Sequence, residues 1–170
     1  MPNSAIVSFY RGTGRDHAGR SLADIWQWDH RRLEMVHDYI QWLFPLREPS
    51  RFNPDAPLVT AADQAAFRAD PELQANLARA LDLMLDFFGL VRLQDRIERG
   101  PQFASRSANW LEPANHNHLR LTRIMIALEL LGRPGDARSL LACLLDIAQH
   151  EGCGVISERT LGFWRDAVPR

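Results

Sequence analysis

The clearest hydrophobic pattern in the chain lies in residues 30–46, which read HRRLEMVHDYIQWLFPL. On a helical wheel of about 100° per residue, five apolar residues share one side: Leu33, Val36, Ile40, Leu43 and Phe44. Three more continue the apolar surface around the back: Met35, Tyr39 and Trp42. The pattern predicts one amphipathic central helix, ended by Pro45, that other elements cover over more than half of its circumference.

A narrow polar sector remains on this wheel. Its residues follow one another at helical spacings, with Asp38 at the edge: His30, Glu34, His37 and Gln41. Because the rest of the wheel is apolar, these side chains are expected to face either water or a polar cavity.

Glu34 and His37 form an E-x-x-H pair, the spacing that places a carboxylate and an imidazole on one helix face in di-iron carboxylate bundles. Those sites need two such helices, and the sequence holds no second E-x-x-H. We favour a hydrogen-bonded seam between helices, with arginine partners. Two alternatives stay open: a ligand pocket, and a mononuclear metal site of His30, Glu34 and His37 completed by His116 or His118.

Start and stop signals predict further helices along the chain. Ser21 with Asp24 begins a short helix over residues 22–28, and Asp29 can cap the central helix. Later helices are expected at these places: from Thr60 to about residue 68, from Asp70-Pro71 to Gly89, from Asn115 to residue 131 with Leu119, Ile126 and Leu130 aligned, over residues 134–149, and from Ser157 onwards.

Three segments lack this helical pattern. Residues 6–10 read as a short extended lead-in. Residues 45–59 contain four prolines and predict a loop, which Phe52 and Leu58 would pin over the core. Residues 90–109 are polar with a Gly-Pro break, so a frayed helix followed by a loop, a mobile flap, is expected there.

These elements predict an all-α fold in which strands are nearly absent. A chain of 170 residues is the natural size of one domain and holds a core without metals or disulfides. We therefore predict a single-domain helical bundle or orthogonal helical array over residues 1–170, with a proline-rich loop after the central helix.

Residues 33–45, which read L-E-x-x-H-D-Y-I-Q-W-L-F-P, resemble the signature of the opioid growth factor receptor domain family. The resemblance continues upstream through Phe9-Tyr10 and Trp28. Downstream it includes further short motifs: Phe52-Asn53, Ala56-Pro57-Leu58, the segment around Phe67, Asn117-His118-Leu119-Arg120 and Thr122-Arg123-Ile124. It therefore covers nearly the whole chain.

The resemblance implies one helical domain of the opioid growth factor receptor (OGFr) type. In animal members of that family the domain is associated with binding of the opioid peptide Met-enkephalin. The resemblance therefore implies receptor-like peptide or small-ligand binding and signalling receptor activity. This chain has no long repeat-bearing tail like theirs. It is therefore similar to a short, bacterial-type member.

Composition narrows the possible functions. A formal net charge of -1 argues against binding to a phosphate backbone, so no nucleic acid partner is expected. All basic residues are arginine, which excludes enzymes that form a Schiff base on lysine.

No export signal and no apolar run long enough to span a membrane are visible, so we expect a cytoplasmic protein. Cys143 is expected to be a buried small hydrophobe, and Cys153 is not expected to act as a nucleophile.

A second polar cluster follows residue 114. It begins with Asn115-His116-Asn117-His118 and continues with Arg120 and Arg123, which are three residues apart near a helix N-terminus. An anion or carboxylate site is one interpretation. We favour an intramolecular partner for the two arginines, such as Glu34 or Asp38, because buried arginine is usually paired.

The sequence carries no recognisable catalytic or nucleotide-binding motif, so no catalytic residue is assigned and an enzyme is not favoured. We predict a non-enzymatic module that holds a peptide or small molecule between the central helix and residues 115–124. Its candidate ligand-binding residues are Glu34, His37, Asp38, Gln41, Trp42, Asn117, His118, Arg120 and Arg123. A peptide amine would bind Glu34 or Asp38, and a peptide carboxylate would bind Arg120 or Arg123.

The alternative is a metal- or haem-binding protein, possibly an enzyme, that uses the histidine and glutamate residues of the central helix: His30, Glu34 and His37. The preferred interpretation needs no cofactor. Either a monomer or a homodimer is compatible with the apolar content.

Overall fold

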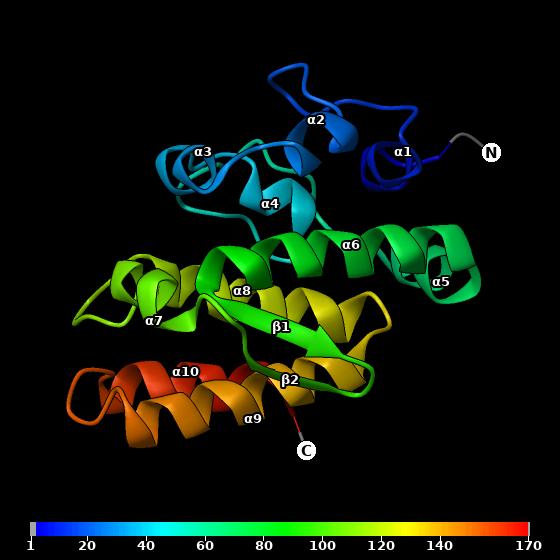
Figure 1. Cartoon of the computed structure of the whole chain (residues 1–170). Helices are drawn as coiled ribbons and strands as arrows, with labels where there is room; N and C mark the ends of the chain where they lie inside the picture. The colour runs from blue at the N-terminus through cyan, green and yellow to red at the C-terminus, as the bar shows by residue number, and fades with distance from the viewer. Residues whose placement is uncertain (1–2, 170) are drawn as a thin grey trace. The chain divides into compact units, whose positions relative to one another are not determined.

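A computed structural model describes residues 3–169 of the chain. The described part is mostly helical and contains one small antiparallel sheet, as Figure 1 shows. It divides into two compact units, which are described separately. Within the described range, the first comprises residues 3–83 with Leu130–Gly132, and the second comprises Met84–Glu129 with residues 133–169. Among the described residues, no helix is both long enough and apolar enough to cross a membrane.

The first unit begins with helix α1, Ala5–Arg11, where an extended lead-in was predicted. That prediction was wrong because local caps stabilise a helix there. The Ser4 side chain accepts a hydrogen bond from the Val7 amide, and Gly12 ends the helix at a φ of 82°. The helix buries Phe9 and Tyr10 in the core of the unit.

Helix α2, Leu22–Trp26, begins at the predicted capping box, in which Ser21 and Asp24 bond to each other's backbone amides. It ends two residues earlier than expected. Asp29 caps the next helix as predicted, since its carboxylate accepts a hydrogen bond from the Arg32 amide.

The prediction of one continuous central helix was wrong. The segment forms two short helices, α3 at His30–Met35 and α4 at Ile40–Leu43, because Val36 adopts an extended conformation with φ -91° and ψ 134°. The Tyr39 hydroxyl donates a hydrogen bond to the Leu33 carbonyl, 2.7 Å away, across this break. The break lets every residue from 39 to 45 be buried, whereas Met35, predicted to lie on the apolar surface, is 67% exposed.

The loop over residues 45–59 is present as predicted, but its anchors are polar. Phe52 is 78% exposed and Leu58 is exposed as well, so neither pins the loop to the core. Asn53 is buried instead, and its amide group donates hydrogen bonds to the Asp38 carbonyl, in the break between α3 and α4, and to Oε1 of Gln41 in α4. Backbone hydrogen bonding between Val59 and Leu46 closes the loop.

Helices α5 and α6 follow their predicted signals closely. Helix α5, Ala61–Ala69, begins at a capping box between Thr60 and Asp63. Helix α6, Pro71–Phe88, buries apolar residues at helical spacings: Leu73, Leu77, Leu81, Met84 and Phe88. Gly89 ends α6 at a φ of 83°, a conformation that glycine adopts without strain.

In the second unit, the predicted frayed helix is instead a β-hairpin. Strand β1, Leu90–Leu93, pairs antiparallel with strand β2, Arg96–Arg99. Gln94 turns the chain between them with a φ of 51°. The hairpin packs against helix α9, where Arg99 bonds to Asp146 and Glu151, so contacts distant in sequence stabilise it. Helix α7, Phe103–Arg106, and a 3-10 turn, Ser107–Asn109, follow where a loop was expected.

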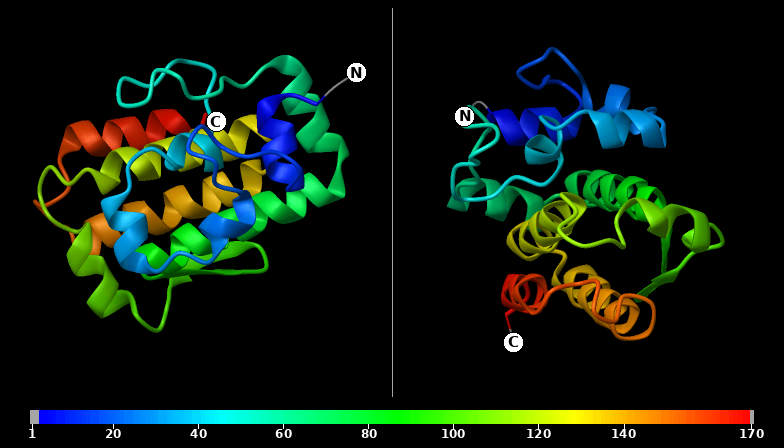
Figure 2. Two further views of the ribbon diagram at one scale, coloured as in Figure 1. Left: turned by 90° about the horizontal axis from the view of Figure 1, so that it is seen from above. Right: turned by 90° about the vertical axis from the view of Figure 1, so that its left-hand side faces the viewer.

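Three helices complete the described chain: α8 at Asn117–Leu130, α9 at Pro134–His150 and α10 at Glu158–Ala167. All three were predicted, but the expected inner face of α8 was wrong. Leu119 is exposed, and the buried residues are those of the neighbouring face: Leu121, Ile124, Met125 and Leu128. Helices α9 and α10 contact each other, and the right-hand view of Figure 2 shows them as neighbours.

Candidate functional site

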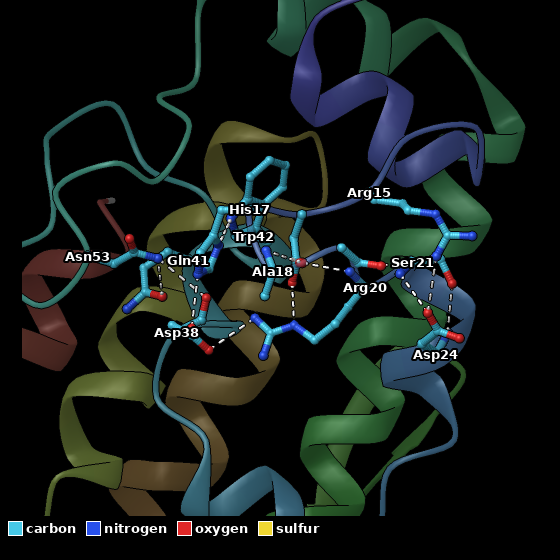
Figure 3. A network of polar contacts seen from close by, with 12 residues as sticks. Arg15, His17, Ala18, Arg20, Ser21, Asp24, Asp38, Gln41, Trp42 and Asn53 are labelled. Carbon is cyan, nitrogen blue, oxygen red and sulfur yellow. Dashed lines mark hydrogen bonds and ion pairs between the residues drawn. The ribbon is translucent and has the colours of Figure 1, made fainter.

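The nine predicted ligand-binding residues fall into both units. Five lie in the first unit and four in the second: Glu34, His37, Asp38, Gln41 and Trp42, then Asn117, His118, Arg120 and Arg123. Three of the first five join one network that also contains residues from two loops, as Figure 3 shows. We call this network the polar cluster and define it by its side chains: Asp16, His17, Arg20, Asp38, Gln41, Trp42 and Asn53.

His17 connects two of the predicted residues. It lies in the loop between α1 and α2, and its ring reaches Asp38 and Trp42, 21 and 25 residues further along the chain. The Trp42 indole donates from Nε1 to Nδ1 of His17, 3.1 Å away, and Nε2 of His17 lies 2.9 Å from Oδ2 of Asp38. The imidazole therefore sits between the indole N–H and the carboxylate.

These partners define the protonation of the His17 ring. An indole N–H can only donate, so Nδ1 of His17 must carry a lone pair. An ionised carboxylate can only accept, so Nε2 of His17 must carry the proton. His17 is thus neutral in this arrangement. Neither ring nitrogen has a free lone pair for a substrate proton or a metal ion until one of the two bonds breaks.

Asp38 is the accessible charge of the polar cluster. Its side chain is 44% exposed, although the Oδ1 atom itself is buried against Nη2 of Arg20, with which it forms an ion pair at 3.0 Å. Partial burial alone would raise the pKa of Asp38, but hydrogen bonds from His17 and Arg20, together with the charge of Arg20, outweigh it and lower the pKa. Asp38 is therefore ionised at neutral pH.

Asp16 organises the loop that carries His17. Its fully buried carboxylate accepts hydrogen bonds from the backbone amides of Ala18 and Arg20, both at 2.9 Å. It also accepts a hydrogen bond from Nε of Arg20 at 2.6 Å. These bonds fix the direction of Arg20, so its guanidinium spans from Asp16 to Asp38.

Gln41 and Asn53 form the inner side of the polar cluster. The Gln41 side chain donates to the His37 carbonyl at 3.3 Å. Nδ2 of Asn53 lies 3.5 Å from Oε1 of Gln41 and 3.4 Å from the Asp38 carbonyl. Both side chains are buried, so they position the Asp38 segment.

Four members of the polar cluster were not predicted from the sequence: Asp16, His17, Arg20 and Asn53. No role was predicted for the glycine-rich segment around His17. The one available signal was the short spacing of Asp16 and Arg20, which is typical of a local ion pair. Nothing local could have indicated that His17 meets Asp38.

The proposed metal ligands do not share one helix face. His30 and Glu34 lie on α3, but that helix ends at Met35, so His37 lies beyond it. The E-x-x-H spacing therefore does not have its helical geometry, and this part of the metal hypothesis was wrong. Within residues 3–169, no group of three or more His, Cys, Asp or Glu side chains is placed to hold a metal ion.

In the second unit, three predicted residues are buried at the start of α8: Asn117, His118 and Arg120. Nη1 of Arg120 lies 3.4 Å from Oδ1 of Asn117, so the amide contributes to holding the guanidinium. Arg123, one turn later, is half-buried, and burial lowers its pKa to about 10.

His118 belongs to a chain of buried contacts in this unit. Its Nε2 lies 2.8 Å from the Trp110 carbonyl, and its own carbonyl accepts from the Trp164 indole at 3.2 Å. The Trp110 indole in turn donates to the Phe88 carbonyl. Burial lowers the pKa of His118, although the hydrogen bond to Trp110 opposes this shift. His118 therefore acts here as a neutral core histidine.

The two cysteines are free, and Cys143 is buried as predicted. Burial raises the pKa of its thiol to about 11, so the thiolate is scarce at neutral pH. Cys153 is exposed.

A comparison with protein families shows where this chain belongs. The opioid growth factor receptor (OGFr) conserved region matches residues 8–168. The chain belongs to the OGFr family. The resemblance indicated by residues 33–45 is thereby confirmed, and the OGFr region extends over both units.

Vertebrate relatives of the OGFr family match the same chain. The opioid growth factor receptor of Homo sapiens is 41% identical over 134 residues, 74% of this chain and 19% of the human protein. The Rattus norvegicus receptor is 42% identical over 142 residues, 78% of this chain and 24% of that protein. Opioid growth factor receptor-like protein 1 of Xenopus tropicalis is 39% identical over 110 residues, 63% of this chain and 21% of that protein.

The chain spans about a fifth to a quarter of the length of these OGFr relatives. No solved structure matches it significantly. The polar cluster is thus described here from the geometry of this OGFr-type chain alone.

Proposed function

We propose that this OGFr-type domain is a non-enzymatic binding module, and that Asp38 recognises a positively charged N–H group on a peptide or small molecule. Membership of the OGFr family supports binding, because the relatives are named as receptors for a growth factor. The observation that carries the proposal is the Asp38 carboxylate, which is ionised and belongs to a side chain that is 44% exposed.

The charge of the polar cluster favours a cation. Asp16 and Asp38 contribute two negative charges and Arg20 one positive charge, while His17 is neutral between Trp42 and Asp38. One negative charge therefore remains. Because Asp16 is fully buried and satisfied by backbone amides, that charge is accessible at Asp38.

A charge-assisted hydrogen bond to a carboxylate is among the stronger contacts available to a protein site. Glu34 and His37 lie on the same chain segment, and we retain them as candidate contacts for the remainder of the ligand. The proposal uses only side chains of the first unit. It needs no metal and no movement of the buried Gln41 or Asn53.

The test compares a peptide with a free N-terminal amine, Met-enkephalin as the first probe, with its N-acetylated form. Binding is measured by isothermal titration calorimetry on the whole chain and on Asp38→Asn. We expect Asp38→Asn to weaken binding of the free-amine peptide about tenfold or more, the usual cost of a lost hydrogen bond to a charged group. Acetylation should weaken binding by a similar factor.

Asp55→Asn is the matched control, because Asp55 is an exposed aspartate of the same unit and the charge change is identical. It should leave the affinity unchanged. Equal affinity of both peptides for the chain, unaltered in Asp38→Asn, or no binding of either peptide, would contradict the proposal.

A further inference from the structure

We propose that His17 is a pH-sensitive switch at the Asp38 site. The neutral ring links Trp42 to Asp38, as Figure 3 shows. On protonation the ring releases Trp42 and cancels the charge of Asp38, so a cation binds more weakly under acidic conditions. This second effect rests on the proposed function, because it concerns cation binding at Asp38.

The Trp42 indole allows only the neutral form of His17 to keep both of its hydrogen bonds. The indole N–H donates to Nδ1 of His17, 3.1 Å away, and Nε2 of His17 lies 2.9 Å from Oδ2 of Asp38. A second proton has to enter at Nδ1, because Nε2 already carries the first. Two N–H donors would then face each other. Protonation of His17 and the hydrogen bond from Trp42 therefore exclude one another.

The two partners of the ring respond differently to an imidazolium. Trp42 is only 7% exposed, and its indole N–H loses this acceptor when His17 takes up a proton. Asp38 is ionised, since its pKa is lowered, so it holds a protonated ring more strongly than a neutral one. The protonated ring therefore stays with Asp38 and gives up Trp42.

A proton can reach His17 without unfolding of the chain, because its side chain is 34% exposed. The loop that carries His17 is held by the Asp16 carboxylate, which accepts from the amides of Ala18 and Arg20 and from Nε of Arg20. None of these bonds involves the imidazole ring. The ring can therefore turn away from Trp42 while the loop stays folded.

Protonation of His17 also changes the charge that a ligand meets. Asp16 and Asp38 contribute two negative charges, and Arg20 contributes one positive charge. The polar cluster therefore carries one negative charge while His17 is neutral, and an imidazolium brings the sum to zero. The new charge lies beside Oδ2 of Asp38, while Arg20 pairs with Oδ1. The attraction of a cation to Asp38 falls as a result.

These charges determine the direction of the pH dependence. Affinity for a cation is full where His17 is neutral, and it falls as the pH drops through the range in which histidines ordinarily titrate, about pH 6.5. Asp38 stays ionised over this range because its pKa is lowered. His37 precedes Asp38 in the chain and is a second titratable group, so its titration is followed separately.

The first measurement needs no ligand. Nuclear magnetic resonance follows the nitrogen-15 signals of His17 and His37, and the Trp42 indole N–H assigned with Trp42→Phe, from about pH 8 to about pH 5. We expect a proton on Nε2 of His17 at the upper end, and an indole signal that moves as His17 titrates. In His17→Gln the indole signal should stay in place, because a glutamine amide offers an acceptor and a donor that do not titrate.

His150→Gln is the matched control, because His150 also contacts an aspartate, Asp146 at 3.2 Å, and the substitution is the same. This variant should keep the indole transition. The switch is overturned by a proton on Nδ1 of His17 at the upper end, by a His17 that does not titrate in this range, or by an indole signal that stays still while His17 titrates. These three results come from the unaltered chain and do not depend on folding of a variant. An indole transition that persists in His17→Gln would overturn the switch as well.

The second measurement adds methylguanidinium, a cation that carries N–H donors and keeps its charge over this pH range. We expect its affinity for the whole chain to fall about fivefold or more between about pH 8 and about pH 5, in step with the titration of His17. His150→Gln should show the same fall. In His17→Gln the affinity should change by less than about twofold, since no charge appears beside Asp38.

The binding data separate the switch from the proposed function. A loss of affinity that follows His37, or equal affinity of the whole chain at both pH values, would overturn the charge effect and leave the Asp38 site in place. Absence of binding at any pH, or binding that Asp38→Asn does not alter, would reject the proposed function and with it the effect on cation binding. The indole titration would still decide whether protonation of His17 releases Trp42.

Discussion

His118 offers a quantitative test of the buried contacts in the second unit. The perturbation is His118→Ala, compared with His118→Gln. The alanine variant loses a buried hydrogen bond that contributes about 1 kcal/mol net to stability. It also leaves the buried Trp110 carbonyl without that donor, which costs about 1–3 kcal/mol of stability. It also loses packing against the edge of Trp164. We expect a total loss of about 2–4 kcal/mol in the free energy of unfolding.

His118→Gln should cost less, about 1.5 kcal/mol or below, because a glutamine amide reaches the same Trp110 carbonyl. The two variants also differ from the wild type in their response to pH. Burial lowers the pKa of His118 in the folded state, so the unfolded chain binds more protons below its own histidine pKa of about 6.5. This contribution to stability is complete above that pH. It falls as the pH drops from the unfolded pKa to the folded pKa.

Urea unfolding followed by circular dichroism, at about pH 8 and about pH 5, measures both effects. The wild type should lose stability on acidification, by up to about 1.4 kcal/mol per pH unit from this one group. His118→Gln should lose less, since it cannot titrate, and the other five histidines are the same in both proteins. The reasoning is refuted if the wild type and His118→Gln show the same pH dependence, or if His118→Ala is as stable as the wild type.

Two further predictions concern the hairpin and its surroundings. Gly89→Ala should lower the free energy of unfolding by at least about 2 kcal/mol, because the φ of Gly89 is 83° and an added Cβ would lie 2.9 Å from atoms of Arg106 and Phe103. The control in the same urea titration is Gly135→Ala, because Gly135 has open space around it. This variant should change the free energy of unfolding by less than about 1 kcal/mol. Arg99→Gln should lower stability by only about 1 kcal/mol, since its ion pairs with Asp146 and Glu151 are partly exposed, and high salt should reduce the difference between the two proteins. A loss that does not depend on salt would show that Arg99 acts through packing instead.

Helices that begin at a hydrogen-bonded cap within a few residues were predictable from the sequence. Ser21 with Asp24 and Thr60 with Asp63 satisfy helix amides within four residues, so the signal and the structure lie in the same short segment. Gly89 is equally local, because the residue itself has the conformational freedom that ends the helix.

The break at Val36 could not be predicted in this way. The apolar pattern of residues 33–44 fits a helix well, and the break depends on burial of Tyr39, Ile40 and the residues after them. Such tertiary contacts outweigh local preference. The hairpin at residues 90–99 was missed for a similar reason, since Gln94 and Asp95 are not the usual Asn-Gly or Asp-Gly turn signal.

Only the part of the candidate site that lies in residues 38–42 was predictable from the sequence. Asp38, Gln41 and Trp42 were identified from the polar sector and the aromatic content of one segment. His17 was not, because the contact that gives it a role spans more than twenty residues and two loops. A helical wheel describes the faces of one helix and does not indicate which loop packs against that helix.

The interruption between α3 and α4 also changes what the backbone at Asp38 can do. In a continuous helix, the Asp38 carbonyl would accept the amide of Trp42 within the same helix. Here that amide bonds to the Tyr39 carbonyl, and the Asp38 carbonyl accepts from Asn53 in the proline-rich loop. One residue thus joins three stretches of chain, with its carbonyl turned to one loop and its carboxylate to the other. Loss of regular helix at four residues is what creates this junction.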